Sequence, residues 1–252
     1  MLKLRGSELR EPVEGLFPAY SRAAYRVLKA VLGTAMRTAY EVRITGVENL
    51  PASGPAILAA NHISFLDSFF IPLSVPRRVT YLAKAEYWDS WRTRWFFETV
   101  GQIPVRRQDA EKAQAALEAG IRVLGAGGLL GIYPEGTRSP DGRLYRGKTG
   151  VARMALRAGC PIIPVGLVGT GDVMPKDSKM PRMSGRVGVS FGRPMTVPSS
   201  GEHEPMALRN FVDALMYEIR EMSGQEYVDR YADRKPKPAA ELRQLAGVSV
   251  SA

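Results

Sequence analysis

A short apolar run, Ala56 to Ala60, constrains the fold more than any other stretch of the sequence. It follows the chain-breaking residues Ser53-Gly54-Pro55 and ends abruptly at Asn61-His62. Five consecutive apolar residues between such boundaries are typical of a strand that is buried on both faces. A strand of this kind needs covering elements on both sides of its sheet, and the sequence therefore favours an α/β fold.

The turn after this strand carries the first candidate for chemistry. Apolar residues recur at helical spacing from Phe65 to Pro76, so we expect a strand, a tight turn and a helix. Asp67 follows His62 by five positions, from where its carboxylate can reach back and accept the N–H of one imidazole nitrogen. The other nitrogen is then free to act as a general base. The alternative is a loop histidine beside an aspartate that caps a helix. The position at the carboxyl end of a buried strand, where α/β sheets place ligands, favours the functional interpretation.

The remaining periodicity completes a mixed, largely parallel central sheet flanked by helices. We predict buried strands over 129–133 and 161–165, an outer strand over 186–191, and further strands over 40–46 (at an edge) and 79–83. Predicted helices cover 20–40, 88–100, 109–126, 149–158 and 205–222. This predicts three regions: a tail and basic amphipathic helix over 1–40, one α/β domain over 41–233, and a loose basic tail over 234–252.

The net charge of +10 indicates an anionic partner such as nucleic acid, an anionic membrane or a phosphorylated small molecule. The basic residues are spread along the chain, which disfavours nucleic acid. We expect no secretory leader and no spanning helix, because the first 18 residues carry charges throughout and no run of about 18 uncharged apolar residues occurs. Two distant histidines and one cysteine make no recognisable metal site. Cys160 stands in an apolar run and is expected in the core, and His203 is expected to have no role.

A second polar stretch, Pro134 to Ser139, follows the predicted strand 129–133 in the same way. Gly136 permits a tight backbone, and the planar guanidinium of Arg138 can hold two phosphate oxygens. Glu135 could orient Arg138, bind an acceptor hydroxyl, or form a plain surface pair with it. Lys148, beside Gly147 and Gly150, is either an auxiliary phosphate contact or a solvated lysine.

Two segments leave alternatives open. The helix over 20–40 carries an apolar stripe and several basic residues, so it either lies in a bilayer interface or packs on the domain core. The segment from Trp88 to Val100 holds all three tryptophans. Its aromatic residues belong to the core, to an apolar wall for an acyl chain, or to an interfacial belt.

Four stretches resemble, in order, the sequence blocks of the glycerolipid acyltransferases, the family that contains 1-acyl-glycerol-3-phosphate acyltransferase. The first, Asn61 to Asp67, is similar to the family's Asn-His-x4-Asp signature. The others are Gly101–Arg107, Tyr133–Ser139 and Cys160–Val165. Pro104 and Val105 depart from the second block, whose terminal arginine corresponds to Arg107, with Arg106 as a second candidate. The resemblance implies substrate contacts from Arg107, Glu135, Gly136, Thr137 and Arg138, to which Lys148 is added as the auxiliary phosphate contact named above.

The resemblance implies an enzyme that moves an acyl group from an acyl thioester to a hydroxyl of 1-acyl-sn-glycerol 3-phosphate, forming phosphatidic acid. His62 would be the general base and Asp67 its partner, with backbone groups of the turn at the thioester oxyanion. The donor would be acyl-coenzyme A or acyl-carrier protein, and no cofactor is needed. Such an enzyme would work on the cytoplasmic face of a membrane as a peripheral protein. The alternatives are a glycerol-3-phosphate or other lysophospholipid acyltransferase, a lipid hydrolase, and a non-catalytic binder of anionic membranes.

Overall fold

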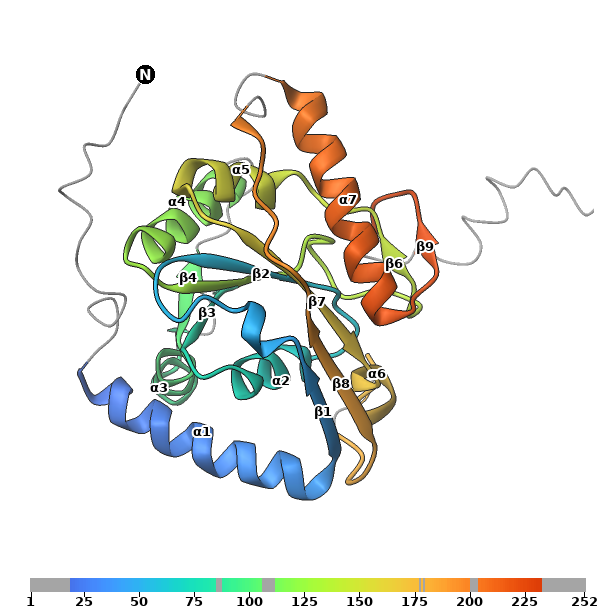
Figure 1. Cartoon of the computed structure of the whole chain (residues 1–252). Coiled ribbons are helices and arrows are strands. Elements are labelled where there is room, and N and C mark those ends of the chain that lie inside the picture. The colour runs from blue at the N-terminus through green and yellow to red at the C-terminus, as the bar shows by residue number, and fades with distance from the viewer. Residues whose placement is uncertain are drawn as a thin grey trace, which may run out of the picture.

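The structure is a computed structural model that describes residues 19–84, 88–105, 112–176, 178, 180–199 and 204–232. Within these residues seven strands form one sheet in the order β1-β8-β7-β2-β5-β3-β4 (Figure 1). The strands are β1 (Glu41–Thr45), β2 (Ala56–Ala60), β3 (Val79–Lys84), β4 (Gln102–Val105), β5 (Leu129–Ile132), β7 (Ile162–Val168) and β8 (Arg186–Phe191). A small separate sheet pairs β6 (Leu144–Tyr145) with β9 (Tyr227–Val228).

The helices are α1 (Ala19–Ala39), α2 (Asp67–Ser74), α3 (Trp91–Thr99), α4 (Lys112–Gly125), α5 (Gly150–Ala158), α6 (Thr170–Val173) and α7 (Pro205–Ser223), with a short 3-10 turn η2 (Val47–Asn49). The strands β7, β2, β5, β3 and β4 are parallel to one another, whereas β8 is antiparallel to β7 and parallel to β1. The sheet is therefore mixed and largely parallel, as the alternation of strands and helices predicts.

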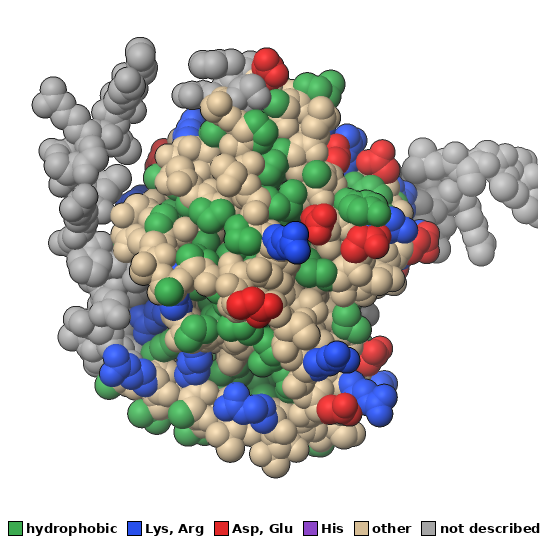
Figure 2. Space-filling model, in the orientation of Figure 1, with side chains coloured by type: hydrophobic (Ala, Val, Ile, Leu, Met, Phe, Trp, Pro, Cys, Tyr) green, Lys and Arg blue, Asp and Glu red, His purple; other side chains and the backbone are tan. Residues whose placement is uncertain are grey.

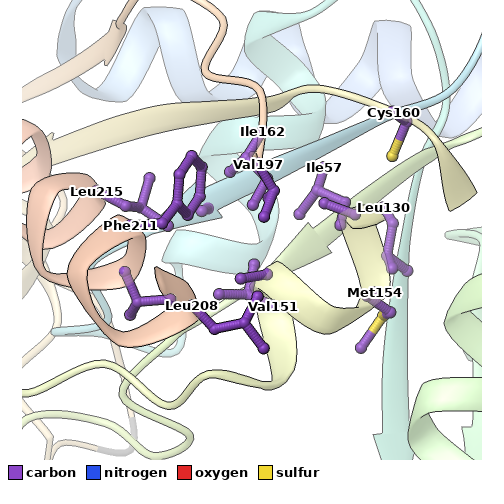
Figure 3. Close-up of a cluster of buried hydrophobic side chains, with 14 of the residues drawn as sticks. Ile57, Leu130, Val151, Met154, Cys160, Ile162, Val197, Leu208, Phe211 and Leu215 are labelled. Carbon is purple, nitrogen blue, oxygen red and sulfur yellow. The ribbon is translucent and has the colours of Figure 1, made fainter. Parts of the chain in front are cut away.

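The strand β2 lies in the middle of the sheet, and all five of its side chains are buried. Ile57 and Ala59 pack on one face with α4, α5 and α7, in the cluster that Figure 3 shows. Ala56, Leu58 and Ala60 pack on the other face, where α2 and the end of α1 supply side chains. Because successive strand residues point to opposite faces, both faces of β2 need apolar residues, and the run is uninterrupted for that reason.

The interior cysteine belongs to the first of these clusters. Cys160 is buried, with Ile57, Leu130 and Ile162 in the same cluster (Figure 3). Burial raises the pKa of its thiol to about 11, so the thiol is neutral at physiological pH. The prediction that Cys160 is a core residue is confirmed.

The strand β8 corrects one sequence prediction. Its alternating pattern predicts an outer strand, but β8 lies between β1 and β7, and β1 forms the sheet edge. Val187, Val189 and Phe191 are buried on the α2 face, whereas Gly188 and Ser190 on the other face are only half-buried. The alternation of apolar and polar residues in β8 therefore shows that one face of the strand is buried, and it does not show that the strand lies at the edge of the sheet. The edge position predicted for the strand at 40–46 is confirmed.

The helix α1 is docked on the body through one side and exposes apolar residues on another. The Nζ of Lys29 donates to the carbonyl of Val75, and the guanidinium of Arg78 lies 4.5 Å from the centre of the Tyr25 ring. Val27 and Val31, which belong to the apolar stripe, are 65% and 60% exposed. The alternative in which this helix packs on the domain core thus holds for one of its sides, and its contact with a bilayer interface stays a prediction.

The exposure of the two tryptophans of α3 rules out one of the alternatives given for this segment. Trp91 and Trp95 are 75% and 49% exposed, so these two are not core residues. The phenylalanines of this segment make its contacts with other aromatic rings. The ring centre of Phe96 lies 6.3 Å from that of Phe69, and the ring centre of Phe97 lies 5.5 Å from that of Trp88, on which it stacks. The helix α3 packs beside α1, and its two tryptophan side chains are exposed.

Candidate active site

The two residues predicted to act together do lie together. The Nδ1 of His62 is 2.8 Å from Oδ2 of Asp67. His62 follows the carboxyl end of β2, and Asp67 is the first residue of α2. Asp67 is fully buried, while the His62 side chain is 16% exposed. The short turn between strand and helix brings the carboxylate back under the imidazole, as the five-residue spacing predicts.

The same carboxylate oxygen also shapes the turn. Oδ2 of Asp67 accepts the backbone N–H of Ile63 at 2.7 Å and that of Ser64 at 2.8 Å. A carboxylate oxygen only accepts hydrogen bonds, so Nδ1 of His62 carries the proton and Nε2 of the neutral ring is unprotonated. Nε2 is therefore the atom that can take a proton from a substrate.

Four backbone N–H groups of this turn are used for hydrogen bonds inside the turn. The N–H groups of Ile63 and Ser64 bind Asp67, that of Leu66 binds the Ser64 hydroxyl, and that of Asp67 binds the Ser64 carbonyl. These four donors are used inside the turn, and stabilisation of a thioester oxyanion by other backbone groups of the turn stays a prediction. Ser64 itself is fully buried and donates to the carbonyl of Met174 at 2.8 Å, which suits a structural residue and not a nucleophile.

The second polar stretch holds the backbone of His62 from both sides. The carboxylate of Glu135 accepts the N–H of His62 at 3.2 Å, and the N–H of Ser139 donates to the carbonyl of His62 at 2.7 Å. The two stretches meet because β2 and β5 are parallel neighbours, with Ala59 opposite Ile132. Residues that follow both strands therefore emerge at the same sheet edge.

Glu135 has contacts that the sequence does not predict. Its side chain is fully buried, and its second oxygen accepts the N–H of Tyr145 at 3.0 Å. Burial raises the pKa of this carboxyl to about 7, although the two backbone N–H donors oppose the shift. In these contacts Glu135 joins the turn at His62 to β6. Binding of an acceptor hydroxyl by Glu135 stays a prediction.

The predicted phosphate contacts lie on the loop after β5. Gly136 has a φ of +74°, and a Cβ at this position would come within 3.0 Å of Lys148 Nζ, so the lysine side chain lies over the glycine. The backbone N–H of Lys148 donates to the carbonyl of Pro134 at 2.8 Å. Arg138 is half-buried and its Nη1 lies 3.5 Å from the carbonyl of Lys176, while Thr137 is half-buried on the same loop. The cationic side chain of Arg138 thus belongs to the loop that also holds His62, and Lys148, which follows β6, packs against this loop.

Asn61 has a role that the sequence analysis missed. Its side-chain amide donates to the carbonyl of Leu167 at 2.9 Å, and its Oδ1 accepts the N–H of the same residue at 2.8 Å. The amide therefore continues the pairing of β2 with β7 after the strand has ended. The available signal was an amide directly after a buried strand, but the sequence does not say which strand it would meet.

A family model described as Acyltransferase matches residues 41–168, which contain both polar stretches. The chain belongs to the acyltransferase family. The resemblance found in the sequence blocks is thereby confirmed.

Several relatives carry the name 1-acyl-sn-glycerol-3-phosphate acyltransferase. LPAT1 of Arabidopsis thaliana chloroplasts is 32% identical over 71% of this chain and 51% of its own length. BAT2 of Brassica napus chloroplasts is 31% identical over 71% of this chain and 53% of its length. The chain thus spans about half the length of these plant relatives. The crystal structure of PlsC, the lysophosphatidic acid acyltransferase of Thermotoga maritima, superimposes with a TM-score of 0.63 at 25% identity, over 84% of this chain and 87% of that one.

Two arginines of the acyltransferase blocks lie outside the described residues. Arg107, like its neighbour Arg106, lies outside the described residues, and so does His203. The role of Arg107 in substrate binding stays a prediction. Within the described residues the candidate site consists of the His62–Asp67 pair, the buried Glu135, and the loop that carries Arg138 and lies next to Lys148.

Proposed function

We propose that this acyltransferase moves an acyl group from an acyl thioester to a hydroxyl of 1-acyl-sn-glycerol 3-phosphate, which produces phosphatidic acid. The observation that carries the proposal is the 2.8 Å contact between Nδ1 of His62 and Oδ2 of Asp67, which leaves Nε2 as a base. The names of the Arabidopsis and Thermotoga proteins support this choice of acceptor, because both describe acyl transfer to a 1-acyl-sn-glycerol phosphate.

The proposed reaction needs no covalent intermediate on the protein. Nε2 of His62 takes the proton of the acceptor hydroxyl while the oxygen attacks the thioester carbonyl carbon. The tetrahedral species then collapses, the C–S bond breaks, and the imidazolium returns its proton to the departing thiolate. Asp67 stabilises the imidazolium that exists between these two steps, and it keeps the ring in the tautomer that can accept a proton.

The acceptor's phosphate is proposed to bind the cationic side chains of Arg138 and Lys148, together with Arg107. The guanidinium of Arg138 has five N–H donors, of which the carbonyl of Lys176 takes one. A phosphate can therefore still be held by a pair of parallel hydrogen bonds from Arg138. The thioester donor is proposed to be acyl-coenzyme A or acyl-carrier protein, and we expect no cofactor.

A membrane-facing surface is proposed on α1 and α3, which pack beside each other. Val27 and Val31 on α1 and Trp91 and Trp95 on α3 are exposed. Figure 2 shows basic side chains along the edge of the molecule where Figure 1 draws α1, with apolar side chains between them. Exposed indole rings and basic side chains are the combination that binds the interface of an anionic bilayer.

No helix among the described residues is both long and apolar enough to cross a bilayer. We propose that the enzyme works as a peripheral protein on the cytoplasmic face of a membrane. The negative surface potential of that leaflet would attract a chain whose net charge is +10.

The proposal is tested with purified protein, radiolabelled palmitoyl-coenzyme A and 1-oleoyl lysophosphatidic acid, with the lipid products separated by chromatography. We expect labelled phosphatidic acid, and a fall of roughly a hundred- to ten-thousandfold for His62→Ala and Asp67→Asn. His203→Gln, which changes the other histidine, is the matched control and should keep its activity. Release of free palmitate without an acceptor would instead indicate a hydrolase. Replacing the acceptor by glycerol 3-phosphate or lysophosphatidylcholine, and the donor by palmitoyl-acyl-carrier protein, tests the remaining alternatives.

A further inference from the structure

The imidazole of His62 has a second contact besides Asp67. The ring of Tyr133 lies parallel to it, with 3.8 Å between the ring centres and 8° between the planes. Tyr133 directly follows β5 and His62 follows the neighbouring strand β2, so the sheet itself brings the two rings face to face. The hydrogen bond to Asp67 holds the Nδ1 edge of the imidazole in place, whereas the stack on Tyr133 holds the plane of the ring.

Tyr133 is itself held by residues from two further elements. Its hydroxyl lies 2.8 Å from Oγ of Ser68 in α2. On the β3 side the ring of Tyr81 lies 5.7 Å from that of Tyr133, with 22° between the planes. Tyr81 fits there because residue 131 is glycine: a Cβ at that position would lie 2.3 Å from the Tyr81 ring. The hydrogen bond to Ser68 and the contact with the Tyr81 ring therefore fix the orientation of the Tyr133 ring.

The groups that face His62 define the electrostatics of this stack. The carboxylate of Asp67 contacts the ring edge, and the carboxyl of Glu135 contacts the His62 backbone. Burial raises the pKa of both Tyr133 and Tyr81 well above the usual value for a phenol, so the two tyrosines are neutral. A neutral aromatic face next to an imidazole stabilises the ring more when the ring is positively charged.

We propose that Tyr133 is a positioning residue for the general base: its ring fixes the plane of the His62 imidazole and supports the positive charge that the imidazole gains during acyl transfer. The inference rests on the proposed function, in which His62 takes the proton of the acceptor. The aromatic ring does this work, and the hydroxyl of Tyr133 only anchors the ring to Ser68.

Two substitutions separate the ring from the hydroxyl. Tyr133→Phe keeps the stack and removes the contact with Ser68, whereas Tyr133→Leu removes the stack. We expect kcat within about threefold of wild type for Tyr133→Phe. For Tyr133→Leu we expect kcat to fall about ten- to a hundredfold with the KM of both substrates little changed, since a displaced catalytic group lowers the rate and not the binding. The acid limb of the rate profile should also move to lower pH for Tyr133→Leu, because an imidazolium without the stack is less stable.

A measurement that does not need activity tests the stack in solution. In a His203→Gln background His62 is the one histidine of the chain, so its ring protons give a single set of imidazole signals. The Tyr133 ring shields these protons, and the shielding should remain in Tyr133→Phe and disappear in Tyr133→Leu. Phe211→Leu, a buried aromatic change in the α7 cluster, controls for a general loss of packing and should leave both readouts unchanged.

Three results would overturn the proposal. One is a Tyr133→Leu protein that loses the shielding but keeps kcat within twofold of wild type. Another is a Tyr133→Phe protein that loses as much activity as Tyr133→Leu, which would assign the effect to the hydroxyl. The third is absence of shielding in the wild-type chain. Failure of the proposed function gives a different result from all three. In that case the His62→Ala protein would retain acyl transfer, which would show that His62 is not the general base, while the shielding by Tyr133 would still be observed in the wild type.

Discussion

The buried carboxylate of Glu135 accepts the backbone N–H of His62 at 3.2 Å, across 73 positions of the sequence. This contact connects the proposed general base to the loop that carries Arg138. The geometry of the site thus depends on an acidic side chain whose pKa is raised to about 7 by burial.

The first prediction concerns stability and pH. Folded Glu135 keeps its proton up to about pH 7, whereas the unfolded chain releases it near 4.5. The folded state therefore binds more protons between these values, and the free energy of unfolding should fall as pH rises through this window. The loss should approach about 3 kcal/mol, at 1.36 kcal/mol for each unit of pKa. Urea unfolding at pH 5 and pH 7.5 measures the larger part of this loss, because the unfolded chain has already released most of this proton at pH 5.

Glu135→Gln cannot titrate and should show a smaller decrease in stability across the same interval than wild type. Glu118→Gln, at an exposed position on α4, is the matched control and should keep the wild-type decrease. Equal decreases in the wild type and the Glu135→Gln protein would show that this carboxyl does not titrate in the window.

The second prediction concerns Asn61. In Asn61→Ala the buried N–H and C=O of Leu167 lose their partner, which should lower the free energy of unfolding by about 2–4 kcal/mol, since each unsatisfied buried group costs about 1–3 kcal/mol. Asn49→Ala removes one bond, to the carbonyl of Phe191, from a half-buried position and should cost less. Chemical denaturation of both proteins compares the two. A similar loss in the two variants would refute the bridging role of Asn61.

The third prediction concerns the binding of the acceptor's phosphate by Arg138. Arg138→Ala should lower kcat/KM for 1-oleoyl lysophosphatidic acid by about ten- to a hundredfold, which corresponds to the loss of a charge-assisted hydrogen bond of about 1.5–3 kcal/mol. Arg138→Lys should resemble Arg138→Ala, because lysine cannot make the paired contact. Arg153→Ala, an exposed change on α5, is the control. If the KM of the acyl donor alone rises, Arg138 binds the donor's phosphates.

The fourth prediction concerns the membrane. Val27→Ser with Val31→Ser, and Trp91→Ala with Trp95→Ala, should each weaken sedimentation with phosphatidylglycerol vesicles, because both pairs are exposed. Binding of the wild type should decrease with salt, since charges are screened beyond about 10 Å at 0.1 M. Met206→Ser, at a 68% exposed position on α7, is the matched control. Vesicle binding that none of these changes alters would place the membrane contact elsewhere.

Local sequence was sufficient for the pair at the centre of the site. The five-residue spacing of His62 and Asp67, directly after an apolar strand, predicts their contact. A short turn between a strand and a helix brings residues at this spacing close together. The central position of β2 was also predictable, since an uninterrupted apolar run needs cover on both faces. The boundaries of β2 and β8 match the predicted ranges for the same reason: both are set by the periodicity of neighbouring residues.

The tertiary structure alone decided which distant residues complete the site. Periodicity places Asn61 after one predicted strand and Tyr133 at the end of another, but it does not show that β7 and β5 are the two neighbours of β2. Strand order fixes the contact of Asn61 with Leu167, the stack of Tyr133 on His62, and the burial of Glu135. These contacts join segments 71 to 106 positions apart, and their free energy comes from packing and hydrogen bonds that exist only once the sheet has formed.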